Sequence, residues 1–543
     1  MNKPIIYQML PRLWGNNTEN PVKNGSLKEN GTGKFSDIDK ATLDYLKWMG
    51  CSHVWYTGII RHSTSDHDAS ARPSHPQFVK GRAGSPYAIC DYYDVNHYLA
   101  DNPEDRMHEF KELINRTHKA GLKVIIDFVP NHVSRDYGKV DHTEGHSILG
   151  ADDDKTVHWK ESNDFYYYPS ETLTLPTPCP VGMSPYNENP AMATGNNCFC
   201  PSPGINDWYE TIKINYCDYY TSTWQKMYEI VDYWAGLGID GFRCDMVELV
   251  PPQFFKWLIH NIKGKYPDVI FIAEVYQKDR YEEYIKNVGF DYLYDKSGIY
   301  DTIRGIVESS QPASAITGCW QYLSELQPHM LNFLENHDEQ RFASEFFGKD
   351  KSRTFASLSV ALFMNTAPFM IYFGEEVGER GMDSEGFSGK DGRTTIFDWW
   401  SIDSVRRLRK IIKDKTYKSL DKDVLIRSGL SEDEAEYFIR FASALRFASS
   451  EMTIQNGLMY DLGYCNTEDN GFCSQNHYAF LRNHNGHTHL VVANFSSEKA
   501  SIKISIPKHA FEWMNIPITE TMYPEVQIPV QIDAYDAVII ELI

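Results

Sequence analysis

The feature that most constrains this fold is an alternation of short apolar runs with longer amphipathic stretches along most of the 543-residue chain. Several runs are apolar throughout, which is typical of parallel strands buried on both faces. The stretches between them, such as 103–120, 221–237 and 352–364, have helical periodicity. Eight strand–helix units in order predict an α/β fold, a closed (β/α)8 TIM barrel. The eight runs are residues 5–13, 53–57, 123–129, 241–245, 269–275, 291–294, 330–334 and 369–373.

Two regions interrupt this alternation and divide the chain. Residues 134–215 are rich in Pro, Gly, Asn and Asp and are too long for a loop after the third strand, so they predict an inserted domain. Near the C-terminus, strand-like runs with turns between them replace the barrel units and predict an antiparallel β-sandwich. We therefore expect two barrel parts, 1–133 and 216–455, around the insert 134–215, with the sandwich at 456–543.

The charge balance excludes two classes of partner. The chain has 53 Lys and Arg against 74 Asp and Glu, a formal net charge of -21. A surface this negative repels phosphate backbones and anionic lipids, so neither nucleic acid nor a membrane is an expected partner. No run is long enough to span a membrane and no signal peptide is recognised, which favours a cytoplasmic protein, or a periplasmic or secreted one if a signal was removed. Oligomeric state and disulfides among Cys179, Cys198 and Cys200 stay open.

Polar residues follow four of the predicted strands at the point where each strand ends. Catalytic residues of such barrels lie at the carboxyl ends of the strands, so these side chains should meet at one mouth. A solvated loop residue explains one of them easily, but it does not explain a set on four strands of the same barrel. The set comprises Asp127 and His132 on the third strand, Arg243 and Asp245 on the fourth, Glu274 on the fifth, and His337 and Asp338 on the seventh.

Carboxylates in this arrangement point to cleavage of a glycosidic bond with retention of configuration. One carboxylate attacks the anomeric carbon, and a second carboxyl group protonates the leaving oxygen and later deprotonates water. Asp245 fits the first role, because Arg243 shares its strand face and should keep it ionised. Glu274 fits the second, because the apolar residues before it should raise its pKa. Asp338 would grip sugar hydroxyls and favour the oxocarbenium-like transition state.

These four segments, in this order, resemble those of the α-amylase family of glycoside hydrolases. The segments read D-F-V-P-N-H at 127–132, G-F-R-C-D at 241–245, F-I-A-E-V at 271–275 and N-H-D at 336–338. Each motif alone is weak, whereas the ordered set is specific and extends over essentially the whole chain. The resemblance implies that residues 134–215 form the family's domain B, which lines one wall of the cleft. It also implies substrate contacts by Tyr87, Asp127, His132, Arg243 and His337.

The sequence departs from the family pattern at two places. Many amylases carry Lys-His three and four residues after the nucleophile, where this chain has Glu248 and Leu249. In calcium-binding members, the second residue of a short motif late in domain B is Asp, where this chain has Lys213. A lysine ammonium could replace the cation, so we expect Asn131 in a lysine-centred network and no cofactor. Asn131 would be a metal ligand only if calcium is bound.

The sequence therefore predicts an enzyme that hydrolyses α-1,4-glucosidic bonds in starch-like glucans or maltooligosaccharides by double displacement. A transglycosylase or an α-1,6-active enzyme would use the same site and stays an alternative. A catalytically inactive binding barrel is disfavoured, because Asp245, Glu274 and Asp338 are all present. Endo or exo attack is left open, since it depends on the shape of the cleft.

Overall fold

The computed structural model describes residues 3–69, 72–139, 145–382, 386–516 and 525–542. Eight parallel strands close into a barrel in the order β1-β14-β13-β12-β11-β10-β5-β2, which confirms the predicted TIM barrel. Each strand falls within one of the eight predicted runs. The strands are β1 (Ile5–Met9), β2 (His53–Tyr56), β5 (Lys123–Phe128), β10 (Gly241–Cys244), β11 (Ile270–Ala273), β12 (Tyr292–Tyr294), β13 (Met330–Phe333) and β14 (Phe369–Tyr372).

The first predicted strand, 5–13, is too long. Strand β1 ends at Met9, and Pro11 begins the short helix α1 (Pro11–Trp14). Proline suits the first turn of a helix because its missing N–H would have no partner there. All four residues of α1 are buried, so apolar composition alone could not separate the helix from the strand.

The helices pack their apolar stripes against the outside of the barrel. In α4 (Arg106–Lys119), for example, Phe110, Leu113, Ile114 and Thr117 are buried at helical spacing. The helices around the barrel include α3 (Lys40–Trp48), α5 (Ser222–Gly236), α6 (Pro252–Lys265), α7 (Asp301–Val307), α8 (Ala315–Leu323), α9 (Thr354–Phe363) and α10 (Asp403–Lys413). One large apolar core joins them to the strands, so the carboxyl ends of the strands are held rigidly.

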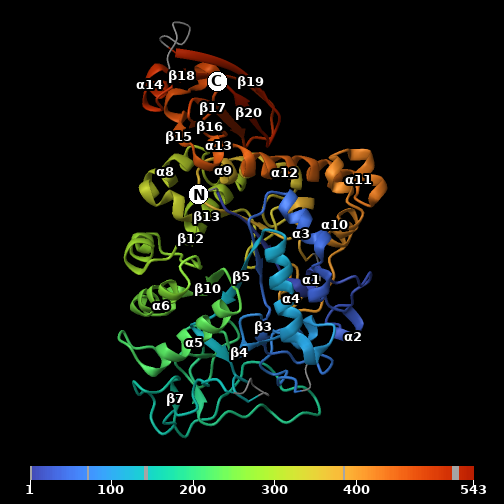
Figure 1. The fold of residues 1–543 in the computed structure, drawn as a ribbon, viewed down its shortest axis with the longest axis vertical. Helices are drawn as coiled ribbons and strands as arrows, with labels where there is room; N and C mark the ends of the chain where they lie inside the picture. Colours follow the sequence, from blue (N-terminus) through green and yellow to red (C-terminus); the bar gives the residue numbers. More distant parts are fainter. Residues whose placement is uncertain (1–2, 70–71, 140–144, 383–385, 517–524, 543) are drawn as a thin grey trace.

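The region 134–215 leaves the barrel after β5 and returns to it before α5. Strand β6 (His132–Ser134) pairs antiparallel with β9 (Thr211–Lys213), so the two ends of the excursion lie side by side. A second short pair, β7 (Tyr167–Tyr168) with β8 (Ala191–Met192), lies within it. Figure 1 shows β7 at one end of the long axis and the C-terminal strands at the other. The exact domain limits 134, 216 and 456 stay a prediction.

The C-terminal region forms two antiparallel layers. A sheet with the order β15-β16-β17-β20 faces the pair β18-β19. Along β16, Tyr478 and Phe480 join the barrel core, whereas Ala479 and Leu481 join a second core shared with β18. This period of two buries both faces of the sheet and fixes it against the barrel. The strands are β15 (Leu458–Asp461), β16 (His477–His484), β17 (His487–Asn494), β18 (Ala500–Pro507), β19 (Glu525–Ile532) and β20 (Ala537–Glu541).

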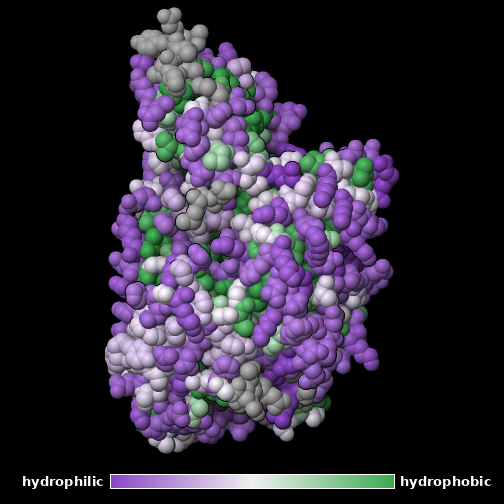
Figure 2. Space-filling model, in the orientation of Figure 1, coloured by the Kyte–Doolittle hydropathy of each residue, from purple (hydrophilic) through white to green (hydrophobic). Residues whose placement is uncertain are grey.

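The surface agrees with the charge balance of the sequence. Figure 2 shows a face covered mainly by hydrophilic residues, with hydrophobic ones scattered among them. Within the described ranges, no helix is long and apolar enough to cross a membrane. All ten cysteines are free thiols in the structure, and the sulfurs of Cys198 and Cys200 lie 3.5 Å apart.

Candidate active site

Arg243 lies at the centre of the site, fully buried at the end of β10. Strand register places it beside Asp127 of β5. Its Nη1 lies 2.6 Å from Asp245 Oδ1 and 3.8 Å from Asp127 Oδ1. Its Nη2 lies 3.0 Å from Glu274 Oε2 and 4.0 Å from Asp338 Oδ2. One guanidinium thus joins four carboxylates that come from four places in the sequence.

Aromatic rings enclose this cation. The rings of Trp55, Tyr87 and Tyr294 lie 5.6, 5.3 and 5.6 Å from the Arg243 guanidinium carbon. Rings at these distances attract a cation through their negative faces and exclude water from it. Tyr294 also accepts a hydrogen bond from Arg243 Nε at 3.2 Å. The guanidinium is therefore fixed in position and cannot follow any single carboxylate.

Asp245 follows β10 directly, and its backbone N–H donates to the Phe128 carbonyl at 2.9 Å. Burial raises the pKa of Asp245 to about 7, while Arg243 acts in the opposite direction and Glu274 adds to the rise. The prediction that Arg243 keeps Asp245 ionised is thus only partly met. It neglected that one guanidinium is shared among several carboxylates inside a dry site.

Glu274 has a polar environment, which contradicts the apolar one that the sequence predicted. Its carboxylate accepts a hydrogen bond from the Met246 backbone N–H at 2.8 Å and another from the Tyr276 hydroxyl. The apolar residues before Glu274 are buried within β11, whereas Glu274 lies just beyond the end of that strand. Glu274 therefore shares its oxygens among Arg243, a backbone amide and a phenol.

His337 and Asp338 come after β13 in the chain. His337 Nε2 lies 3.0 Å from Asp338 Oδ2 and 2.5 Å from the Tyr87 hydroxyl. Desolvation raises the pKa of Asp338, but His337, Arg243 and Arg393 outweigh it and bring that pKa down to about 2. Asp338 is consequently ionised at neutral pH, whereas the pKa of Asp245 lies near neutrality.

Tyr87 and His132 complete the set of substrate contacts that the resemblance implied. The Tyr87 ring stacks on His337 with centroids 5.2 Å apart, and its hydroxyl lies 3.3 Å from Asp127 Oδ1. Burial lowers the pKa of His132 to about 3, with Lys213 and Lys80 adding to the effect. His132 is therefore a neutral hydrogen-bonding group in the site. The structure brings together all eight predicted residues, and their individual roles stay predictions.

A cavity of about 380 Å³ lies above these residues, within the range of pockets that bury a small ligand. Its lining includes residues that the sequence analysis did not predict as part of the site. Tyr276 could have been found, because it is only two residues after Glu274, close enough to contact its carboxylate. The others come from distant loops and carried no local signal. They are Lys80 and Ser85, Trp208, Glu210 and Thr211 of the insert, and Ile396 and Phe397 after β14.

Lys213 makes the contact that the departure from the family pattern predicted. The residue is 5 % exposed. Its ammonium group donates hydrogen bonds to Asn131 Oδ1 and, at 2.8 Å, to the Leu249 carbonyl. Burial lowers the pKa of Lys213 to about 7. The ammonium thus occupies the space between the insert, the β5 loop and the segment after Asp245. Whether the chain also binds calcium stays open.

A comparison with known protein families identifies the class. Residues 23–435 match the family model described as the catalytic domain of α-amylase, which is more than half of the chain. The chain therefore belongs to the α-amylase family of glycoside hydrolases. This agrees with the barrel and with the carboxylates that surround Arg243.

Curated relatives are distant and span several activities. Neopullulanase 2 of Thermoactinomyces vulgaris is 21% identical over 398 residues, which cover 69% of this chain and 57% of that protein. α-Amylase 3 of Dictyoglomus thermophilum is 25% identical over 371 residues, 63% of this chain and 60% of that protein. The chain thus spans less than two thirds of the length of these relatives.

Solved structures support the fold over the whole chain. A maltogenic α-amylase from Thermotoga neapolitana is 18% identical, with a TM-score of 0.59 over 99% of this chain and 96% of that one. A cyclic α-maltosyl-(1→6)-maltose hydrolase from Arthrobacter globiformis, solved with maltose, is 16% identical with a TM-score of 0.63 over 99% of both chains. At such identities the likeness describes the fold alone.

Proposed function

We propose that this protein hydrolyses α-1,4-glucosidic bonds of maltooligosaccharides or starch-like glucans with retention of configuration. One observation carries the proposal: a single buried guanidinium holds Asp245 and Glu274 within 3.0 Å of its nitrogens on the floor of one cavity. Retaining chemistry needs two carboxyl groups close to the same glycosidic bond, one as nucleophile and one as acid/base. The maltose and cyclic α-maltosyl-(1→6)-maltose named for a structural neighbour support this substrate class.

The proposed reaction has two steps. In the first, an Asp245 oxygen forms a bond to the anomeric carbon while the bond to the leaving oxygen breaks, and Glu274 gives that oxygen its proton. In the second, Glu274 takes a proton from water, and the water oxygen replaces Asp245 at the same carbon. Asp245 must be ionised to attack, so a substrate that displaces Glu274 from Arg243 would favour the reactive form.

Asp338 is the third group of the mechanism. Its low pKa keeps it charged in the free site, and His337 fixes its orientation. An ionised carboxylate at this place can accept hydrogen bonds from sugar hydroxyls and stabilise positive charge that develops on the ring. Tyr87 and His132 would hold the same ring from the opposite side of the cavity.

The test is incubation with maltoheptaose, with products resolved by length and their anomeric form followed by NMR. Shorter sugars that appear first in the α form are the expected result. First products in the β form would contradict retention. Products longer than the substrate would show that a sugar hydroxyl replaces water and would favour the transglycosylase. No reaction with maltoheptaose, but cleavage of an α-1,6-linked oligosaccharide such as isomaltotriose, would favour the α-1,6-active alternative.

A further inference from the structure

Residues 74–88, called here the bridging segment, connect two walls of the cavity. The segment lies between β3 (Ile60–His62) and β4 (Ile89–Val95) and includes the cavity residues Lys80, Ser85 and Tyr87. We propose, on the basis of the function above, that it closes the donor side of the site. The donor side is the side that would bind the sugar attacked by Asp245 and the sugars beyond it toward the non-reducing end. The enzyme would then attack α-glucans from the non-reducing chain end, because an internal stretch of chain has no exit there.

The direction of the substrate follows from the two carboxyl groups. Glu274 would protonate the leaving oxygen, so the leaving part of the chain lies on its side, near Met246 and Tyr276. The sugar that Asp245 attacks then lies among Tyr87, His337 and Asp338. Any further donor sugars extend away from Glu274, toward the bridging segment and the loop after β14.

On one side, the bridging segment is tied to the insert. Gln77 Nε2 donates to the Thr177 carbonyl at 3.1 Å, and the Tyr186 backbone N–H donates to Gln77 Oε1 at 2.9 Å. The rings of Phe78, which is fully buried, and Tyr186 lie 4.8 Å apart. These contacts fix the segment by hydrogen bonds between the Gln77 side chain and the backbone of the insert and by ring packing, which a loose surface loop lacks.

An ion pair adds to this attachment at the cavity itself. Lys80 Nζ lies 2.9 Å from Glu210 Oε2, and the two side chains are 15% and 7% exposed. Both residues line the cavity, so the pair joins the bridging segment to the insert at the cavity wall. A buried pair is costly to open, because each charge would lose its partner without regaining full solvation.

On the other side, the bridging segment meets the loop after β14. The Ala83 backbone N–H donates to the Phe397 carbonyl at 3.0 Å. Gly81 has a φ of +64°, and a Cβ there would come within 2.2 Å of the same carbonyl oxygen. Only glycine permits so close an approach in this conformation. The two loops therefore form a continuous wall behind the attacked sugar.

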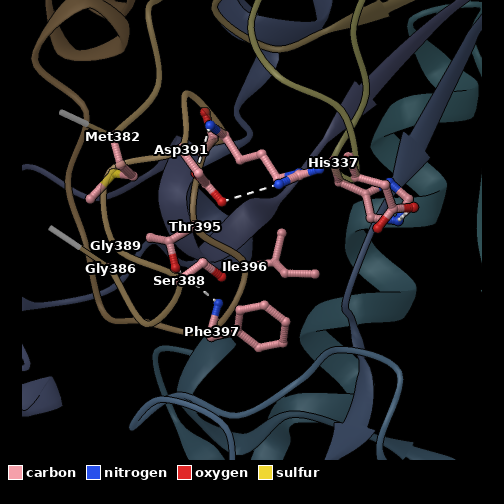
Figure 3. A pocket seen from close by; sticks show the side chains of 12 residues that line it. His337, Met382, Gly386, Ser388, Gly389, Asp391, Thr395, Ile396 and Phe397 are labelled. Atoms are coloured by element: carbon pink, nitrogen blue, oxygen red, sulfur yellow. Dashed lines mark hydrogen bonds and ion pairs between the residues drawn. The ribbon is translucent and has the colours of Figure 1, made fainter. Parts of the chain in front are cut away.

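A smaller space remains between this wall and Asp338. A second cavity of about 300 Å³ shares Asp338, Ile396 and Phe397 with the first and is otherwise lined mainly by the loop after β14. In Figure 3, Ile396 and Phe397 point from that loop toward the side on which His337 lies. The volume of this space, about 300 Å³, leaves room for about one further sugar on the donor side. The expected first product is therefore glucose or maltose.

The experiment compares two forms of maltoheptaose labelled at the reducing end, one free and one blocked at its non-reducing sugar by a polyethylene glycol chain larger than both cavities. The wild-type enzyme should release glucose or maltose from the free form from the earliest times. It should cleave the blocked form at least about 100-fold more slowly, because the wall leaves no room for the blocking group. Comparable cleavage of both forms would overturn the inference and leave the proposed function intact. Cleavage of neither would overturn the proposed function.

A pair of double variants tests the wall itself. Lys80→Met with Glu210→Gln removes the ionic contact at similar volume, and it should raise the ratio of blocked to free cleavage about tenfold. Lys226→Met with Asp164→Asn removes an equally buried pair between α5 and the insert, 2.6 Å long, that lines neither cavity. This control should leave the ratio unchanged. Equal ratios in both double variants would contradict a role of the Lys80–Glu210 pair.

Discussion

Two buried cations of the site have opposite surroundings. Arg243 has four carboxylates within 4.0 Å, whereas Lys213 is held by an amide oxygen and a backbone carbonyl. In the first region burial, with a smaller contribution from Glu274, raises the pKa of Asp245 to about 7. In the second a cation lacks a carboxylate, and burial lowers the pKa of Lys213 to about 7. The region around Arg243 thus concentrates charge, while the region around Lys213 has one ammonium group held by neutral oxygens.

The largest expected effect comes from Asp245→Asn. The amide cannot form the covalent bond, so kcat on maltoheptaose should fall by about 10⁴-fold or more. Residual activity within tenfold of wild type would exclude Asp245 as the nucleophile. Glu274→Gln gives a second, independent readout, since added azide should restore turnover of a substrate with a good leaving group if Glu274 is the acid/base.

The same Asp245→Asn variant should be more stable than wild type at neutral pH. The folded pKa of Asp245 lies above its ordinary value, so the folded state binds more protons between pH 3.8 and about 7 and loses stability as the pH rises through this window. An amide cannot ionise, so the variant should gain about 1–3 kcal/mol over wild type at pH 7.5 and little at pH 4. Urea unfolding at both pH values measures this. A gain that does not depend on pH would contradict the explanation.

Arg243→Met should destabilise the protein, because it removes the cation that four carboxylates share. Unfolding at pH 7 should be easier by about 3–5 kcal/mol, and the loss should shrink at pH 5 as carboxylates take up protons. Arg482→Met is the matched control, since Arg482 is equally buried but donates to the backbone carbonyls of Thr453, Met364 and Ile454. Its loss should not depend on pH in this range.

Lys213→Met tests the second region through a change in pH dependence. The folded pKa of Lys213 lies below its ordinary value of 10.5, so the unfolded state binds more protons above pH 7 and wild-type stability should rise with pH from about 7 upward. The variant should lack this rise, with a difference of about 1–3 kcal/mol between pH 7 and 9.5. Parallel pH curves for the two proteins would contradict the assignment.

The smallest effect is expected at a surface pair. Lys265 Nζ lies 2.7 Å from Asp232, with side chains 53% and 28% exposed. Solvent and salt screen such pairs, so Lys265→Met should leave both kcat and the melting temperature within error. A clear fall in melting temperature would show that surface charge contributes more than the comparison of the two buried cations assumes.

Local patterns in the sequence predicted the barrel and the convergence of the polar residues at its mouth. The eight strands bury nearly all of their residues, on both faces, so the apolar runs were visible without any partner. The polar residues at strand ends were visible for the opposite reason, since they interrupt apolar surroundings. The first strand was predicted too long because α1 is as buried as β1.

The sequence by itself determined which residues meet at the mouth of the barrel, because strand order and side-chain alternation fix that convergence. Only the tertiary structure decided how their charges are shared. One guanidinium serves four carboxylates, so the pKa of Asp245 depends on groups from other strands. The wall made by Lys80, Glu210 and Phe397 likewise joins loops far apart in the chain. Such contacts leave no periodic signal in a sequence, since their partners are set by how the loops fold over the barrel.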